Sequence, residues 1–193
     1  LCKGAAGGLP ETLKPQDGIA LNAFHRIIAS NVDSCQAAAA RANQAGCSAE
    51  VVTTALTGEA SLVGAQIAAA ARTQMDLDRP FVFIWGGETT VTVAGNGTGG
   101  RNLEAALGAV EGMAGLRGMY LVTLATDGED GPSGAAGAVV TGDTLNKALK
   151  LGLEPSSYLG ENDSYTFFKK TGNLLVTGPT GTNVNDITFL FGF

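Results

Sequence analysis

The segment Gly86–Glu104, which reads GGETTVTVAGNGTGGRNLE, constrains the fold of this chain more than any other stretch. The apolar residues before it, Phe81–Trp85, are typical of a strand that is buried on both faces. The β-branched run Thr89–Val93 predicts a second short strand. Four glycines follow between residues 95 and 100, where the backbone can turn sharply and approach other groups closely. An amphipathic helix is then predicted from the apolar residues at helical spacing, Leu103, Ala106, Leu107 and Val110.

Arg101 stands at the start of this predicted helix, where its positive charge opposes the helix dipole. The free amide groups of a helix N-terminus attract an anion. A phosphate or carboxylate held by those amides and by both prongs of the guanidinium would satisfy both groups, so we predict an anion site here. The alternative is a tight strand–helix turn in which Arg101 points to solvent or pairs with Glu104.

Two known phosphate-binding motifs fit this loop incompletely. Gly95, Gly97 and Gly100 match the G-x-G-x-x-G dinucleotide pattern, but no acidic residue stands about 20 positions later to hold a ribose. The spacing from Gly95 to Gly100 also imitates a P-loop, but Arg101–Asn102 replace its Lys-Ser/Thr pair. We therefore expect a phosphate-type loop of another kind.

The order of predicted elements indicates an α/β fold, with a mostly parallel or mixed sheet covered by helices in Rossmann-like layers. Helices are expected after the caps Ser30–Asp33, after Thr57–Glu59 and after Asp143. Asn162 and Asp163 are interpreted as caps of a later helix. The further predicted strands are Phe24–Ala29, Val51–Leu56, Met119–Ala125, Ala135–Val140, Asn173–Thr177 and Ile187–Phe191.

Composition excludes several classes of function. The 193 residues carry a net charge of −6 and no basic run, which argues against nucleic acid as a partner. No apolar stretch is long enough to predict membrane insertion, and no signal peptide is visible. The three cysteines lack metal or redox spacing, and their odd number suits a reducing compartment, either the cytoplasm or an organelle matrix.

An acidic loop, Thr126–Pro132, follows the predicted strand Met119–Ala125. Ligands of open α/β sheets gather at the carboxyl ends of strands. Asp127 and Asp130 therefore stand where Mg²⁺ or a substrate hydroxyl would be handled, and we predict them as catalytic residues and metal ligands. The alternative is that two Asp-Gly pairs serve only as turn residues.

A second polar loop, Thr177–Asp186, lies between the last two predicted strands. Its small hydroxyls, amides and glycines suit a phosphate or a polyol, and the alternative is an elaborate turn. The residues proposed to line the site from this loop are Thr180, Gly181, Thr182 and Asn183.

Taken together, these loops closely resemble the C-terminal part of the class II glycerate kinases, including their MOFRL domain. The matching motifs occur in family order and span nearly the whole chain. They are LPETLKP at 9–15, LTGEA at 56–60, GGETTVTV at 86–93, GNGTGGRN at 95–102, LATDGEDGP at 124–132, AAGA at 135–138, NDSY at 162–165 and TGPTGTNVND at 177–186.

The resemblance implies an organisation and an activity. Residues 1–22 would be an N-terminal arm or linker, residues 23–79 the tail of the kinase α/β domain, and residues 80–193 a MOFRL-like α/β domain. The family is expected to transfer the γ-phosphoryl group of ATP to glycerate, giving 2-phosphoglycerate, with Mg²⁺ in a cleft between two α/β domains. Its members are also often labelled hydroxypyruvate reductases, which implies a nicotinamide cofactor.

On this template Arg101 would stabilise a phosphate or the glycerate carboxylate. Asp127 and Asp130 would hold Mg²⁺ or orient the attacking hydroxyl. The substrate- and phosphate-binding residues would be Gly86, Gly87, Glu88, Gly97, Gly99, Gly100 and Asn102, with the Thr180–Asn183 loop forming the other wall.

The chain departs from the family pattern at Trp85, Leu103 and Ser133–Gly134, where Ser, Gln and Thr-Asp are usual. The family's N-terminal domain has no counterpart in the sequence, so we expect the chain to be inactive unless a second polypeptide supplies it. Such a piece should expose an apolar face. The alternatives are a non-catalytic structural or interaction subunit of a larger assembly and, less in keeping with the incomplete dinucleotide motif, an NAD(P)H-dependent reductase.

Overall fold

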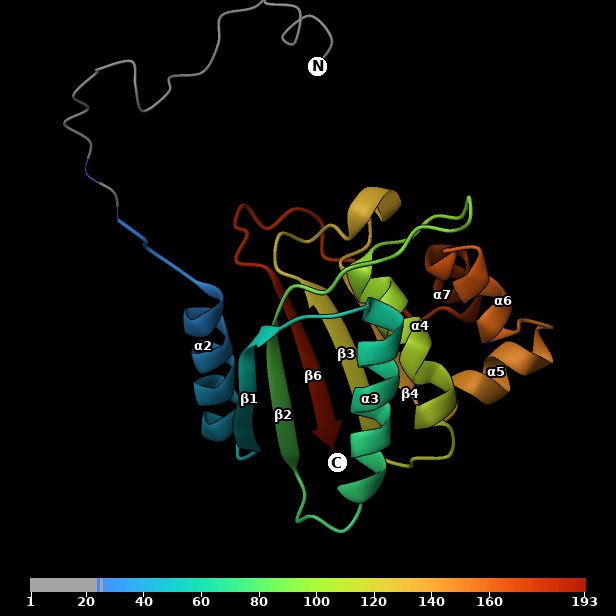
Figure 1. The fold of residues 1–193 in the computed structure, drawn as a ribbon. Coiled ribbons are helices and arrows are strands. Elements are labelled where there is room, and N and C mark those ends of the chain that lie inside the picture. Colours follow the sequence, from blue (N-terminus) through green and yellow to red (C-terminus); the bar gives the residue numbers. More distant parts are fainter. Residues whose placement is uncertain (1–23, 25) are drawn as a thin grey trace, which may run out of the picture.

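The computed structural model describes residues 24 and 26–193, which form an α/β fold around a six-stranded sheet (Figure 1). The strand order is β1-β2-β6-β3-β4-β5. Their bounds are β1 Ser48–Leu56, β2 Phe81–Gly87, β3 Met119–Ala125, β4 Gly137–Thr141, β5 Leu174–Leu175 and β6 Asp186–Gly192.

The sheet is mixed, as one form of the fold prediction had it. Among the described strands only β1 and β2 pair in parallel, and all other pairings are antiparallel. The expectation of a largely parallel sheet was wrong because β6, from the end of the chain, inserts between β2 and β3 and runs opposite to both. The predicted boundary between residues 79 and 80 lies between two strands, β1 and β2, that share this sheet.

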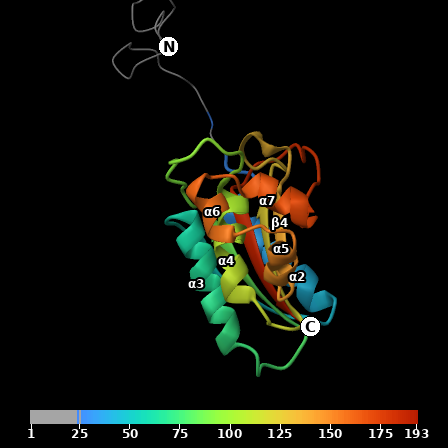
Figure 2. The same cartoon turned by 90° about the vertical axis from the view of Figure 1, so that its right-hand side faces the viewer.

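Helices lie on both faces of the sheet. The described helices are α2 Asn31–Gln44, α3 Ala60–Thr73, α4 Arg101–Met113, the 3-10 turn η2 Gly131–Ser133, α5 Thr144–Lys150, α6 Pro155–Gly160 and α7 Ser164–Thr171. In the turned view α3 and α4 stand on one side of the sheet and α2 on the other (Figure 2). Ser30 caps α2, as predicted, and Asp33 completes a reciprocal capping box with it. Within the described residues, no helix combines the length and apolarity that a membrane crossing requires.

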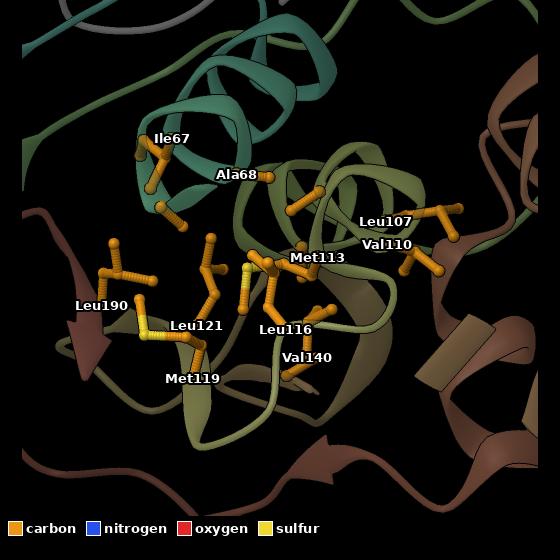
Figure 3. Close-up of a cluster of buried hydrophobic side chains, with 14 of the residues drawn as sticks. Ile67, Ala68, Leu107, Val110, Met113, Leu116, Met119, Leu121, Val140 and Leu190 are labelled. Atoms are coloured by element: carbon orange, nitrogen blue, oxygen red, sulfur yellow. The ribbon is translucent and has the colours of Figure 1, made fainter. Parts of the chain in front are cut away.

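The main core fills the space between α3, α4 and the sheet (Figure 3). This core contains Leu107, Val110 and Met113 of α4, Leu121 of β3 and Leu190 of β6, all of them buried. The apolar stripe predicted for this helix is therefore confirmed as its packed face. A second cluster beneath α2 joins Cys35 to β2 and to Ile187 of β6.

Glycine lets α3 and α4 cross closely. A Cβ at Gly64 of α3 would overlap the carbonyl oxygen of Ala105, and a Cβ at Gly108 of α4 would overlap that of Ser61. We expect Gly64→Ala to lower the free energy of unfolding by about 1–3 kcal/mol, because two helix backbones must separate.

The matched control is Gly160→Ala in α6, where a Cβ would meet nothing. Since alanine is the better helix former, this variant should be neutral or more stable by about 0.5–1 kcal/mol. Denaturant unfolding measures both variants, and equal stabilities would contradict the close-packing argument.

Three predicted strands differ from those observed. The run Thr89–Val93 forms only an isolated bridge between Glu59 and Thr90, and the Thr92 amide bonds to the Glu59 side chain instead of to a strand. Among the described residues of the predicted strand 24–29, none is in a strand, and Phe24, Ile27 and Ile28 are 85–91% exposed. The strand predicted at Asn173–Thr177 is shortened to β5. The predicted arm, residues 1–22, and His25 lie outside the described residues.

Candidate functional site

Three loops that are far apart in the sequence meet at one end of the strands. They are the glycine loop 95–100 before α4, the acidic loop 126–132 after β3 and the polar loop 176–185 before β6. The Thr180 amide donates to the Asp127 carbonyl at 3.0 Å, and Asn183 Nδ2 donates to Asp127 Oδ2 at 3.0 Å. Arg101 links the glycine loop to Asp186, the first residue of β6. The prediction that these loops share one site is consistent with this arrangement.

Arg101 is held between two carboxylates. Its Nη1 lies 2.7 Å from Glu88 Oε1 and its Nε lies 3.1 Å from Asp186 Oδ2. The Arg101 and Glu88 side chains are 40% and 49% exposed, whereas that of Asp186 is 12% exposed. The nearly buried Asp186 carboxylate therefore orients the guanidinium, while the Arg101 side chain remains partly open to solvent. It does not form the pair with Glu104 that was one alternative.

Opposing effects act on the pKa of the Asp186 carboxyl. Burial raises its pKa, while the hydrogen bond and the charge of Arg101 act in the opposite direction. Removing Arg101 would leave this buried acid without its cation.

The anion site predicted at the start of α4 is occupied by a carboxylate of the chain itself, that of Asp130. Asp130 Oδ1 accepts from the Asn102 amide at 3.0 Å, and Asp130 Oδ2 accepts from the Leu103 amide at 2.8 Å. Asn102 Nδ2 donates to the same carboxylate at 3.2 Å, and Asp130 is only 2% exposed. The N-cap residue is Gly100, and a Cβ there would overlap the Asp130 carboxyl group. Asp130 thus caps the helix from a distant loop.

Asp127 and Asp130 consequently differ in what they can do. Burial raises the pKa of Asp130, and its hydrogen bonds to Leu103 and Asn102 lower it. Both oxygens of Asp130 accept buried hydrogen bonds from the start of α4, whereas the hydrogen bonds to the two oxygens of Asp127 lie at the surface. Asp127 is half-buried and faces the polar loop.

The other glycines of the glycine loop also approach neighbouring parts of the protein closely. Cβ atoms at Gly95 and Gly97 would overlap the backbone of Glu161 and Asp163, and one at Gly99 would overlap Ser164 Oγ. The glycine loop is therefore packed on the junction of α6 and α7.

The side chains of Asn162 and Asp163 accept hydrogen bonds from backbone amides of this loop and of Ala94 before it. Asn162, at a φ of 52°, accepts from the amides of Ala94 and Gly95 at 2.7 and 2.9 Å. Its Nδ2 donates to Glu104 Oε1 at 3.1 Å. Asp163 is the N-cap residue of α7, as predicted, but its side chain does not cap the helix and instead accepts from the Thr98 amide at 3.1 Å.

The remaining predicted residues have varied places. A Cβ at Gly86 would overlap Asn31 and Cys35 of α2, and one at Gly87 would overlap the Leu56 backbone, so both glycines permit close packing. Gly181 and Thr182 are exposed on the polar loop. Beside Arg101 a hollow of about 210 Å³ remains open. It is lined by Val91, Val93, Gly97, Gly99, Gly100, Arg101, Glu104, Pro132 and Asn162.

Asp186 and Glu104 belong to this region although the sequence analysis did not assign them to a site. Asp186 closes the TGTNVND motif, which was the available signal. Glu104 is 4% exposed, whereas the sequence suggested only a surface pair with Arg101.

Glu104 should make stability depend on pH. Burial raises its pKa above the ordinary value of 4.5, the hydrogen bond from Asn162 lowers it, and the charges of Glu59 and Asp130 raise it further. Its contribution is therefore fully present below the unfolded pKa and is lost as the pH rises through the folded pKa.

We expect Glu104→Gln to match the natural chain at acidic pH and to become the more stable of the two as the pH approaches neutrality. Denaturant unfolding across pH measures this difference. Glu111→Gln, at an exposed position of the same helix, controls for the loss of one carboxylate. A Glu104→Gln difference that shrinks toward neutral pH would contradict the assignment.

The described residues contain no cluster of three His, Cys, Asp or Glu side chains that could hold a metal ion. Mg²⁺ commonly uses one or two carboxylates together with substrate phosphates, so a single carboxylate suffices. Asp127 fits that requirement, whereas Asp130 would have to give up its hydrogen bonds to the helix.

Comparisons with known proteins match this chain to a family. The model of the MOFRL family matches residues 81–186. The chain is 46% identical to "D-glycerate 2-kinase" of Thermotoga maritima and 42% identical to a "Putative hydroxypyruvate reductase" of Agrobacterium vitis, covering 79% and 84% of this chain. A crystal structure of glycerate kinase from Thermotoga maritima superposes on 87% of this chain with a TM-score of 0.84 and 42% identity.

The chain spans less than half of each of these proteins, namely 38%, 38% and 42% of their lengths. The family match covers more than half of this chain and includes β2, the glycine loop, α4 and the acidic and polar loops. The resemblance seen in the sequence motifs is thereby confirmed, and the chain belongs to the MOFRL family.

Proposed function

We propose that this chain is part of an ATP-dependent glycerate kinase that forms 2-phosphoglycerate, as its C-terminal part. The single observation that carries the proposal is Arg101, oriented by Asp186 and open to solvent at the meeting point of three loops. Identity of 46% to a protein named D-glycerate 2-kinase supports the choice of substrate. The chain aligns with 38% of that protein. We therefore propose that a further domain, on the same or another polypeptide, completes the enzyme.

Arg101 would bind the phosphoryl group or the glycerate carboxylate. Phosphoryl transfer depends on alignment and charge neutralisation, and a planar guanidinium offers two parallel donors to either anion. Glu88 is half-exposed and can move away at little cost when a substrate anion arrives. Asp186 stays buried and keeps the guanidinium oriented while Glu88 leaves.

Asp127 would hold Mg²⁺ together with phosphate oxygens of ATP. Its Oδ2 is oriented by Asn183 and its Oδ1 accepts from the Glu129 amide at 3.1 Å. The ion would supply positive charge to the phosphates. Asp130 would act indirectly, because it fixes the start of α4 and hence the position of Arg101.

The reductase alternative draws support from the name of the Agrobacterium vitis relative. The geometry disfavours it, because the glycines of the imperfect dinucleotide motif are packed on Glu161 and Asp163. The start of α4, where such a motif places a pyrophosphate, is occupied by Asp130.

The proposal is tested on the native complex that contains this chain. Its intact mass reports whether another polypeptide is present, and incubation with ATP, Mg²⁺ and glycerate should give 2-phosphoglycerate, with ATP or glycerate omitted as controls. Oxidation of NAD(P)H by hydroxypyruvate without phosphorylation would favour the reductase. A complex with neither activity would favour the non-catalytic structural or interaction subunit.

A further inference from the structure

The segment between β2 and α4 forms one wall of the hollow beside Arg101. It runs across the ends of the strands toward α6 and α7 (Figure 1). Its side chains Val91 and Val93 line the hollow together with Arg101, Glu104 and Asn162. Val91 is half-buried and Val93 is 76% exposed. Two apolar side chains therefore stand near a partly exposed guanidinium, which suits a ligand with an anionic end and a short carbon chain.

Polar contacts from other parts of the chain hold this wall in place. The Thr92 amide and hydroxyl donate to the two carboxylate oxygens of Glu59 at 3.0 and 2.9 Å. Asn162 Nδ2 donates to the Thr92 carbonyl at 3.3 Å, in addition to the amides that its Oδ1 accepts. The Gly97 amide donates to the Glu161 carbonyl at 2.8 Å. The wall is thus positioned without a ligand, as the walls of most ligand pockets are.

The size of the hollow suits a small acid. Its volume of about 210 Å³ corresponds to about seven water molecules at about 30 Å³ each. Pockets for drug-sized ligands measure about 300–1,000 Å³. A three-carbon hydroxy acid therefore fits in the hollow as a whole, whereas ATP would fit only in part.

Charge and hydrogen-bond donors suit the same ligand. Arg101 supplies a cation to the lining and Glu104 an acid, a balance that favours one carboxylate over the several charges of a triphosphate. Burial raises the pKa of Glu104, so its carboxyl keeps a proton to a higher pH than an ordinary glutamate and repels an incoming anion less. Within the described part of the chain, the amides of Gly99 and Gly100 have no hydrogen-bond acceptor, so they can donate to a ligand oxygen.

We propose that this hollow binds the acceptor acid, with its carboxylate on Arg101 and its carbon chain against Val91, Val93 and Pro132. Val91 would then limit the length of the acid, because a longer chain would meet this half-buried side chain. The inference rests on the proposed function and deepens it, since it assigns the glycerate carboxylate, rather than the phosphoryl group, to Arg101.

The test uses the native complex that contains this chain, with steady-state kinetics at varied glycerate and at varied ATP. Val91→Phe fills the hollow and should raise the KM for glycerate about tenfold or more, while the KM for ATP stays unchanged. Val52→Phe, at a 46% exposed position of β1, is the matched control and should change neither KM. An unchanged KM for glycerate in Val91→Phe would overturn the proposal. A rise in the KM for ATP instead would also overturn it, because the nucleotide would then occupy the hollow.

The opposite substitution tests the size limit and serves as the second variant if Val91→Phe does not fold. Val91→Ala enlarges the hollow, so kcat/KM for a four-carbon sugar acid should rise about tenfold relative to kcat/KM for glycerate. A role of Val91 in stability alone would lower both values together. An unchanged ratio would therefore contradict the proposal.

Glycerate binding to the complex without ATP, measured by calorimetry, separates this inference from the proposed function. A complex that binds glycerate but forms no 2-phosphoglycerate would overturn the proposed function, and Val91→Phe should then still raise the dissociation constant for glycerate about tenfold. If product forms while both Val91 variants behave as the natural chain does, the proposed function stands and the hollow is not the acceptor site.

Discussion

Asp130→Ala is expected to destabilise the protein by about 3 kcal/mol or more, because two buried amide groups lose their acceptor and each orphaned group costs about 1–3 kcal/mol. The amides are those of Asn102 and Leu103, at the start of the helix that carries Arg101. Gly100 has no side chain that could replace the lost cap. Denaturant unfolding measures the loss, and hydrogen exchange at the first turn of α4 should rise with it.

Two variants separate capping from catalysis. Asp130→Asn keeps the shape and one acceptor oxygen, so its loss of stability should be smaller than that of Asp130→Ala. Asp127→Ala removes a half-buried carboxylate that no helix depends on, and it should lower kinase turnover with little change in stability. Equal stabilities of Asp130→Ala and Asp127→Ala would contradict the capping role.

Arg101→Ala is expected to reduce turnover of the active complex by about 10²–10³-fold, the usual effect of removing a donor that faces developing charge. The reason is that the proposed site contains an oriented and exposed guanidinium between Glu88 and Asp186. Steady-state kinetics with glycerate and with ATP measures the change. A loss in kcat indicates a role in the transition state, and a rise in KM alone indicates a role in substrate binding.

Arg101→Lys is the matched control for charge. Lysine keeps the cation but lacks the two parallel donors, so its activity should fall between those of the natural chain and Arg101→Ala. Unfolding measurements on both variants exclude a loss caused by the unpaired Asp186 carboxylate. Full turnover by Arg101→Ala would remove Arg101 from the proposed mechanism.

The local elements of this fold were largely predictable from sequence. The strand over Met119–Ala125 was predicted with its observed bounds, and the helix beginning at Arg101 was predicted from the spacing of apolar residues. These features depend on interactions between near neighbours, which the periodicity of side chains records. The runs Thr89–Val93 and Phe24–Ala29 have the composition of strands, but a strand also needs a partner, which composition does not specify.

The candidate site was predictable in its loops but not in its contacts. The sequence indicated that the glycine loop, the acidic loop and the polar loop carry polar groups at strand ends, and the structure brings them together. It could not distinguish Asp127 from Asp130, because the difference lies in burial and in which amides each carboxylate meets.

By itself, the sequence determined most of the helices and strands, the resemblance to the MOFRL family and the loops that form the candidate site. Only the tertiary structure decided that β6 inserts between β2 and β3. It also decided that Asp130 binds the free amides at the start of α4 and that Asp186 orients Arg101. Asp130 lies 28 residues from Asn102, and Asp186 lies 85 residues from Arg101. Contacts over such separations form because apolar faces pack into a common core, and that packing then places the polar groups that each face carries.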